Sequence, residues 1–180
     1  RQTRCLPHIL RPALRVLGLS ILLIAASPAA ATAAESRLAD AVERMDRSGL
    51  RALLEQRVDV NAPQVDGMTA LHWAADQDDL ETAKLLLAAK ANVKAESRYG
   101  VTPLSLACAN GNTAMVELLL EAGADPNAVL RGGETALMTA ARTGKPGPVK
   151  ALLARGARVD AKEKRGQTAL MWAAADGHAD

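Results

Sequence analysis

The sequence contains no phenylalanine, one tyrosine and two tryptophans among its 180 residues. Sandwich and barrel cores are rich in aromatic and β-branched side chains, so this scarcity argues against an aromatic-rich β-sandwich. The apolar residues that are present are mainly alanine and leucine, which are strong helix formers. We therefore expect a helical core in which small side chains let neighbouring helices approach closely.

Acidic residues are absent from residues 1–33, which carry four arginines followed by an apolar run over 16–26. Pro28 and the triplet Ala31-Thr32-Ala33 come next. A basic region, an apolar core and an Ala-x-Ala site are typical of a secretory signal peptide. The run is short for a membrane span, which needs about 20 residues. We predict a signal peptide over 1–33, with a retained membrane anchor or an organellar transit peptide as alternatives.

The net positive charge of the chain comes from this segment. Residues 1–33 hold four of the 22 basic residues and none of the 20 acidic ones, so their removal turns a net charge of +2 into −2. The remainder therefore gives no global electrostatic argument for nucleic-acid binding. The Ala-rich composition and the Ala-x-Ala site suggest a bacterial protein that is periplasmic or secreted. Because the sequence begins with Arg1 rather than Met, we expect that residues precede it.

A period of 33 residues runs through the rest of the chain without any insertion, in a threonine, a leucine and an alanine register. The members are Thr69, Thr102, Thr135 and Thr168; Leu54, Leu87, Leu120 and Leu153; and Ala62, Ala95, Ala128 and Ala161. Fixed self-similarity of this length is the signature of a repeat architecture.

Each unit predicts two short helices. A glycine precedes the threonine by two residues, and the threonine is suited to cap the first helix. The first helices are Ala-rich and cover 71–75, 104–108, 137–141 and 170–174. Gly111, Gly144 or Gly177 ends the first helix, and Gly123 or Gly156 ends the second. Such a pair cannot bury its own apolar face, so the units must stack into an all-α repeat solenoid.

The repeated segments resemble the ankyrin repeat signature. They read GMTALHWAA at 67–75, GVTPLSLAC at 100–108, GETALMTAA at 133–141 and GQTALMWAA at 166–174. The segment VELLLEAGADPNA at 116–128 resembles the family's second helix and exit. The resemblance implies L-shaped helix pairs joined by projecting β-hairpin loops, in proteins that mostly bind other proteins.

The domain organisation follows from this period. We predict an ankyrin repeat domain over 34–180, with units at about 36–62, 63–95, 96–128 and 129–161 and an incomplete unit at 162–180. Counting back one period from Thr69 reaches Ser36, a suitable first cap with no hairpin before it. Because the last unit is incomplete, we expect the natural chain to continue, with more repeats or with another domain.

Several residues depart from the family pattern. Only His72 occupies the signature histidine, which supports a hydrogen-bond network in that family. Arg57 and Lys90 replace the glycine that ends the later second helices, and left-handed geometry there would cost about 1 kcal/mol each. Pro148 is expected to shorten its helix by a few residues and to soften 142–149.

The sequence offers no catalytic constellation. No pair among His8, His72 and His178 has metal-ligand spacing, and Cys108 occupies a helix-packing position. Cys5 would leave with the signal peptide, so no intramolecular disulfide is expected. The glycine-rich segment 131–134 lacks the Lys-Ser/Thr of a phosphate-binding loop. We therefore predict no enzyme activity, no cofactor and no metal.

We expect function to lie on a concave face made of the hairpin tips and the exposed side of the first helices. The candidate tip residues are Asp66, Met68, Arg98, Tyr99, Val101, Arg131, Glu134, Lys164 and Arg165. The candidates on the first helices are Asp76, Gln77, Asn110 and Arg142. Tyrosine and arginine are common in binding hot spots, and the basic tips could favour an acidic partner.

The two tryptophans lie outside this set. Trp73 and Trp172 are expected to pack between helix pairs, with a contact role as the alternative.

Our interpretation is a monomeric scaffold that binds a partner protein through this face. We expect no contact with nucleic acid. We expect contact with a membrane only if residues 1–33 are retained. The alternative is the targeting module of a larger enzyme whose catalytic domain lies beyond residue 180.

Overall fold

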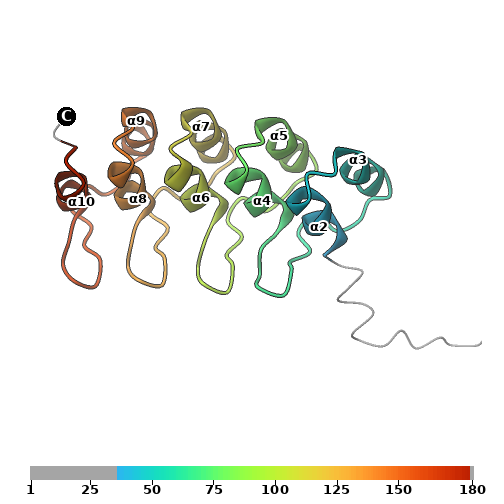
Figure 1. Ribbon diagram of the computed structural model, residues 1–180, viewed down its shortest axis with the longest axis horizontal. Helices are drawn as coiled ribbons and strands as arrows, with labels where there is room; N and C mark the ends of the chain where they lie inside the picture. The colour runs from blue at the N-terminus through green and yellow to red at the C-terminus, as the bar shows by residue number, and fades with distance from the viewer. Residues whose placement is uncertain (1–35, 179–180) are drawn as a thin grey trace, which may run out of the picture.

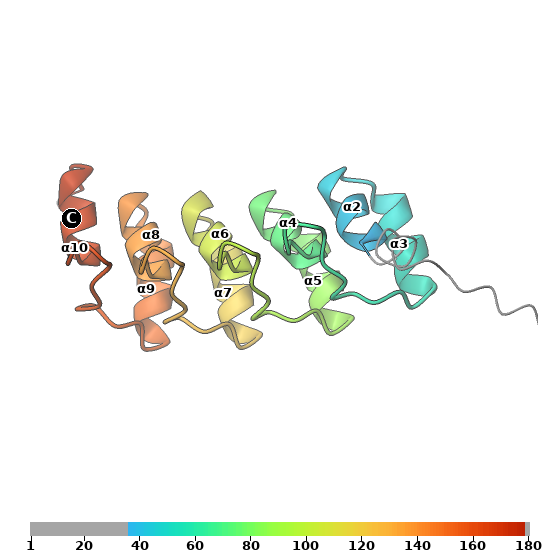
Figure 2. The ribbon, with the colours of Figure 1, turned by 90° about the horizontal axis from the view of Figure 1, so that it is seen from below.

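The computed structural model describes residues 36–178 and shows helix pairs that follow one another in a single row (Figure 1, Figure 2). The first helices of the units are α2 (Arg37–Glu43), α4 (Ala70–Asp76), α6 (Pro103–Asn110), α8 (Ala136–Arg142) and α10 (Ala169–Ala175). The second helices are α3 (Arg47–Glu55), α5 (Leu80–Ala88), α7 (Thr113–Glu121) and α9 (Pro146–Ala154). The all-α repeat solenoid is confirmed. The signal peptide predicted for residues 1–33 lies outside the described residues.

Most of the helices begin at a side chain that accepts a backbone N–H, and the exceptions are α2 and α9. The Thr102 hydroxyl accepts from the amide of Ser105 at 3.2 Å at the start of α6, and the other threonines of this register also cap first helices. The second helices α3, α5 and α7 use Asp or Asn instead, as when Asp79 accepts from the amide of Thr82 at 3.1 Å, whereas α9 begins at Lys145 without such a cap. These caps satisfy amides that have no partner within the helix. The predicted starts of α4, α6, α8 and α10 are therefore correct for a local, chemical reason. Ser36 does precede α2, but the capping predicted for it is wrong, because its hydroxyl donates to the Asp40 carboxylate at 3.4 Å instead of accepting a backbone N–H.

The residues that end the helices have left-handed backbone geometry in every unit, including the units in which that residue is not glycine. Arg57 and Lys90 have φ of 55° and 67°, which confirms the geometry expected of them. Met45 and Asp78, both at φ 56°, occupy the register of Gly111 and were not foreseen. Left-handed geometry therefore recurs at two positions of the repeat, one between the two helices and one after the second helix, whether or not the residue is glycine.

Pro148 does not shorten its helix. Helix α9 contains nine residues, as do α3, α5 and α7. Pro146 and Pro148 are the first and third residues of α9, where an amide has no intrahelical acceptor to lose. The predicted shortening is therefore wrong, and so is the reason for expecting softness at 142–149.

The core runs along the whole row. Leu71, Leu104 and Leu137 occupy one register of the first helices and are fully buried between neighbouring units. The alanines three residues later, such as Ala107, are also buried and let the helices approach. On α10 the same register places Leu170 on the surface, 78% exposed. Leu38 holds this register in the first described unit and is 1% exposed with a neighbouring unit only on its C-terminal side, so burial at this position depends on the unit that follows.

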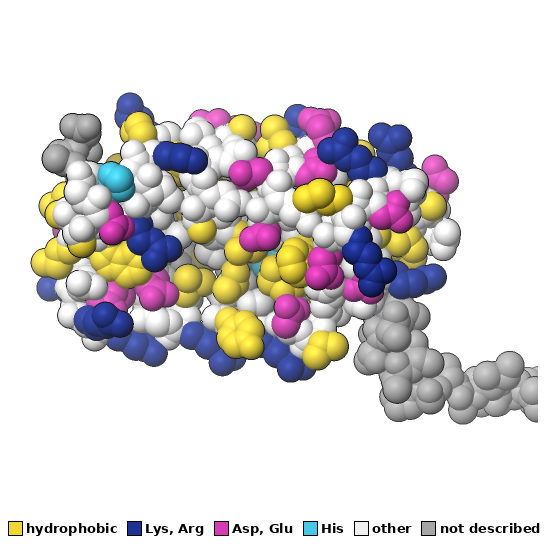
Figure 3. All heavy atoms as spheres, in the orientation of Figure 1, with side chains coloured by type: hydrophobic (Ala, Val, Ile, Leu, Met, Phe, Trp, Pro, Cys, Tyr) yellow, Lys and Arg dark blue, Asp and Glu magenta, His cyan; other side chains and the backbone are white. Residues whose placement is uncertain are grey.

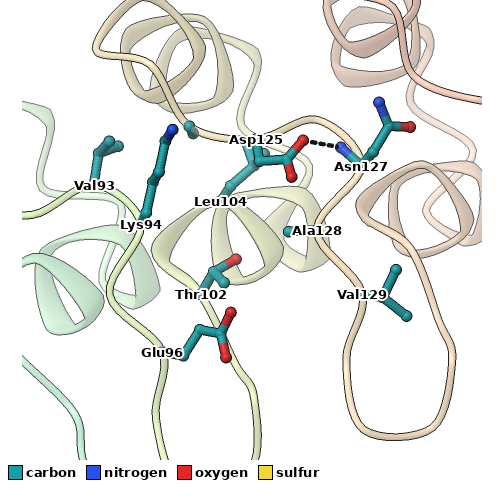
Figure 4. A pocket seen from close by; sticks show the side chains of 10 residues that line it. Val93, Lys94, Glu96, Thr102, Leu104, Asp125, Asn127, Ala128 and Val129 are labelled. Carbon is teal, nitrogen blue, oxygen red and sulfur yellow. Dashed lines mark hydrogen bonds between the residues drawn. The ribbon is translucent and has the colours of Figure 1, made fainter.

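Asparagines join the loops of neighbouring units. The Asn61 side chain accepts from the amide of Asn92 at 2.6 Å, and Asn127 accepts from the amide of Arg158 at 2.9 Å. Lys94 holds the same position at the junction between these two and has no acceptor to offer. A cleft of about 290 Å³ opens there, lined by Lys94, Leu104 and Asp125 among others (Figure 4).

This comparison makes Lys94→Asn a stabilising substitution. An asparagine would accept from the amide of the next loop, so we expect the free energy of unfolding to rise by about 1 kcal/mol. Lys94→Ala removes the ammonium group without adding an acceptor, and should change stability by less than about 0.5 kcal/mol. Urea unfolding of both variants measures the difference. Equal effects of the two substitutions would show that the hydrogen bond is not the cause.

Candidate functional site

The hairpin loops project from the first helices in a row (Figure 1). Each is closed by two backbone bonds, as where Ser97 donates to Val101 and Gly100 donates to Ser97, both at 2.9 Å. Two pairs of neighbouring loops are also joined, because the Arg98 amide donates to the Asp66 carbonyl at 2.8 Å and the Lys164 amide donates to the Gly132 carbonyl at 3.5 Å. Within residues 36–178 the only β pairing is an isolated bridge between Val129 and Thr135, so the hairpins are tight loops without regular strands.

The predicted tip residues are brought together along this edge. Those whose side chains are exposed are Arg98, Tyr99, Arg131, Lys164 and Arg165, and those half-buried are Asp66, Met68, Val101 and Glu134. Tyr99 is 69% exposed, an unusual position for an aromatic ring unless it has a contact role. The Asp66 carboxylate accepts from the amide of Met68 at 2.9 Å and so shapes its own turn.

The residues predicted on the first helices separate into two kinds. Asp76 and Arg142 end their helices with exposed side chains. The Gln77 amide donates to the Glu43 carbonyl at 2.9 Å, and the Asn110 amide donates to the Asp76 carbonyl at 2.7 Å. These two amides therefore bond to the preceding unit. Sequence periodicity could not reveal these bonds, because each partner lies 34 residues away.

His72 fixes a hairpin to the helix of the preceding unit. Its Nδ1 accepts from the amide of Thr69 at 3.1 Å, and its Nε2 lies 3.0 Å from the Val101 carbonyl. Because Nδ1 accepts an N–H, the hydrogen must be on Nε2, which donates to Val101. Burial lowers the pKa of His72. The expected network is confirmed, and it also holds the next hairpin in place. Ser105 in the following unit bonds only to Thr102.

The two tryptophans lie at the same register and are both half-buried against the core. The Trp73 indole donates to the Gln64 side chain at 2.7 Å. Trp172 instead has the Arg142 guanidinium 5.5 Å from its ring centroid, and it lines a cavity of about 210 Å³. The core packing expected of both is thus only partial.

The hairpin edge is basic. Figure 3 shows Lys and Arg side chains along the edge of the molecule where the loops end. Three salt bridges occur within residues 36–178, namely Arg47–Asp79, Lys84–Glu81 and Arg155–Glu121. None of them uses a tip residue, so intramolecular salt bridges leave the charge of this edge unneutralised.

Reactive groups are buried or dispersed in the described part of the chain. Cys108 is fully buried as expected, and burial raises the pKa of its thiol to about 12, so it is not a thiolate at neutral pH. Across residues 36–178, no three His, Cys, Asp or Glu side chains are grouped to hold a metal ion. The helices in this range are also too short to cross a membrane. The arrangement presents a shaped, charged surface.

Comparison with known families agrees with this geometry. A family model described as ankyrin repeats (3 copies) matches residues 38–130 and again residues 127–180. No curated protein matches the chain significantly.

Proposed function

Because this chain belongs to the ankyrin repeat family, we propose that it is a monomeric scaffold that binds a partner protein through its concave face. Ankyrin repeats generally serve as protein–protein interaction modules. The observation that carries the proposal is the row of hairpin tips, each closed by backbone bonds, which presents Tyr99 beside unneutralised cations. A rigid edge of this kind binds with little loss of conformational freedom.

The opposite side of the molecule has a different composition. The exposed positions of the second helices include Glu81, Lys84, Glu117 and Glu121, and all of these except Glu117 take part in the salt bridges described above. Mixed charges that neutralise each other are typical of a solvated surface. This contrast favours the hairpin side as the binding side.

Affinity capture tests the proposal. The bait is the protein from residue 34 onward, beside a variant with Arg98, Tyr99, Arg131 and Arg142 all changed to alanine. All four side chains are exposed, so the variant should fold, which circular dichroism verifies. We expect one protein held by the first bait and lost, by a factor of about ten or more, on the second. Equal recovery on both baits would contradict binding through this face.

We further propose that the protein is exported and acts in the periplasm or outside the cell, from the basic, apolar and Ala-x-Ala pattern of residues 1–33. Intact mass spectrometry of the protein from its native cells should give a mass that begins near residue 34. A mass that includes residues 1–33 would show that the segment is retained, and would favour a membrane anchor.

A further inference from the structure

The concave face contains one cavity that lies between the hairpins and three successive first helices, α6, α8 and α10. Its apolar lining comes from Val101, Leu106, Leu130 and Trp172, and the polar lining includes Arg142 and Glu134. The volume is about 210 Å³. Small-molecule sites usually measure about 300–1,000 Å³, so this cavity suits one inserted side chain better than a whole ligand.

The two tryptophans differ in their hydrogen bonding. Trp73 is locked, because Gln64 accepts its N–H and in turn donates to Asp40 and Glu43 at 2.7 Å. Glu163 occupies the register of Gln64 in the last unit, and its carboxylate accepts from the amide of Gln167 at 3.1 Å.

Among the described residues, the indole N–H of Trp172 has no such hydrogen bond. Its buried N–H has no acceptor within residues 36–178, whereas buried polar groups are normally paired. No amide network covers the groove at this tryptophan as Gln64 does at Trp73. The indole ring is therefore available to a bound side chain.

Arg142 supplies the charge at this cavity. Its guanidinium lies over the Trp172 ring, 5.5 Å from the centroid, while its side chain remains exposed. A guanidinium held over an aromatic ring is pre-oriented and can still bind a carboxylate through two parallel hydrogen bonds. Glu134 lies in the same lining but forms no ion pair with Arg142 within 4.0 Å in the described residues. An incoming carboxylate would thus avoid Glu134 and approach from the Arg142 side.

We propose that this cavity, the Trp172–Arg142 pocket, anchors an acidic segment of the partner protein. One apolar side chain of the segment enters the pocket against Trp172, and the carboxylate of a neighbouring Asp or Glu pairs with Arg142. The exposed basic tips at Arg131 and Lys164 extend the attraction along the same segment. The inference rests on the proposed function, because it assigns the partner's chemistry on the face proposed to bind it.

A displayed library of random peptides of about 12 residues is the probe, selected on the full-length mature protein. Selected sequences should share an apolar residue next to one or two carboxylates. Their affinity, measured by fluorescence anisotropy, should fall about tenfold or more for Arg142→Gln and for Trp172→Leu. Two matched controls, Trp73→Leu at the same register and Lys150→Gln on α9, should stay within about twofold of the unsubstituted protein.

Arg142 is exposed, so Arg142→Gln keeps the test valid even if Trp172→Leu unfolds. Peptides that Arg142→Gln binds as well as the unsubstituted protein does would overturn the inference, as would a library that yields no binder. If such peptides lose affinity when Arg98 and Tyr99 are changed to alanine, the proposed function stands without this pocket. Peptides whose affinity is unchanged by all of these substitutions would contradict the proposed function as well.

Discussion

Leu104→Ala should lower the free energy of unfolding by about 2–5 kcal/mol, whereas Leu170→Ala should change it by less than about 0.5 kcal/mol. The two leucines occupy the same position of their units, two periods apart. Leu104 is 1% exposed between α4 and α8, and Leu170 is 78% exposed on α10. Deleting the buried side chain removes apolar burial and leaves a cavity, while the exposed one has little burial to lose.

Urea unfolding followed by circular dichroism measures both variants of the 180-residue chain under the same conditions. The pair is its own control, since residue type, register and substitution are identical. Costs that agree within about 1 kcal/mol would contradict the claim that stability at this position comes from neighbouring units.

His72→Ala should have the second large effect, lowering the free energy of unfolding by at least about 2 kcal/mol at neutral pH. The substitution leaves the amide of Thr69 and the carbonyl of Val101 without their partner at the junction of two units. His72→Ser is the informative companion. It should restore the bond to Thr69, as Ser105 bonds to Thr102, but it is too short to reach Val101. Its stability should therefore lie between those of the alanine variant and the unsubstituted protein.

The same histidine should make the fold sensitive to mild acid. Burial lowers the pKa of His72 below its ordinary value of 6.5, so the unfolded chain binds the proton first as the pH falls. The stabilisation is therefore complete above about pH 6.5 and is lost as the pH falls from there through the lowered pKa of the folded state. Protonation would also place a hydrogen on Nδ1, where the amide of Thr69 already donates.

Unfolding at intervals between about pH 7 and pH 5 measures this effect, because carboxylates titrate mainly below that window. The unsubstituted protein should lose more stability across the window than His72→Ala does. Parallel pH profiles for the two proteins would show that His72 is not the responsible group.

Local chemistry made much of the fold predictable. The threonine register placed the starts of α4, α6, α8 and α10, and the glycine register anticipated the left-handed geometry of Arg57 and Lys90. Periodicity also implied left-handed geometry at Met45 and Asp78, but this turn was not recognised because neither residue is glycine. Pro148 was misjudged because its effect depends on its place in the first turn of α9, which the sequence fixes only to within a residue or two.

Contacts between units were harder to predict. The tip residues could be placed because their position in the unit determines their exposure. The side-chain bonds of Gln77 and Asn110 could not, since they depend on groups of another unit. The same is true of Arg142 over Trp172, where two ordinary positions of different units meet to form the pocket. The helices and turns of the repeat could be predicted, but the arrangement of the variable side chains between units could not.

Photo-crosslinking in the native cells tests most directly whether the concave face binds a partner protein. A photoreactive residue is placed at position 99, on a hairpin tip, and in a separate variant at position 117, where exposed Glu117 lies on α7. We expect a covalent adduct of defined mass from position 99 and none from position 117. An adduct from position 117 alone, or none from either position, would contradict the account.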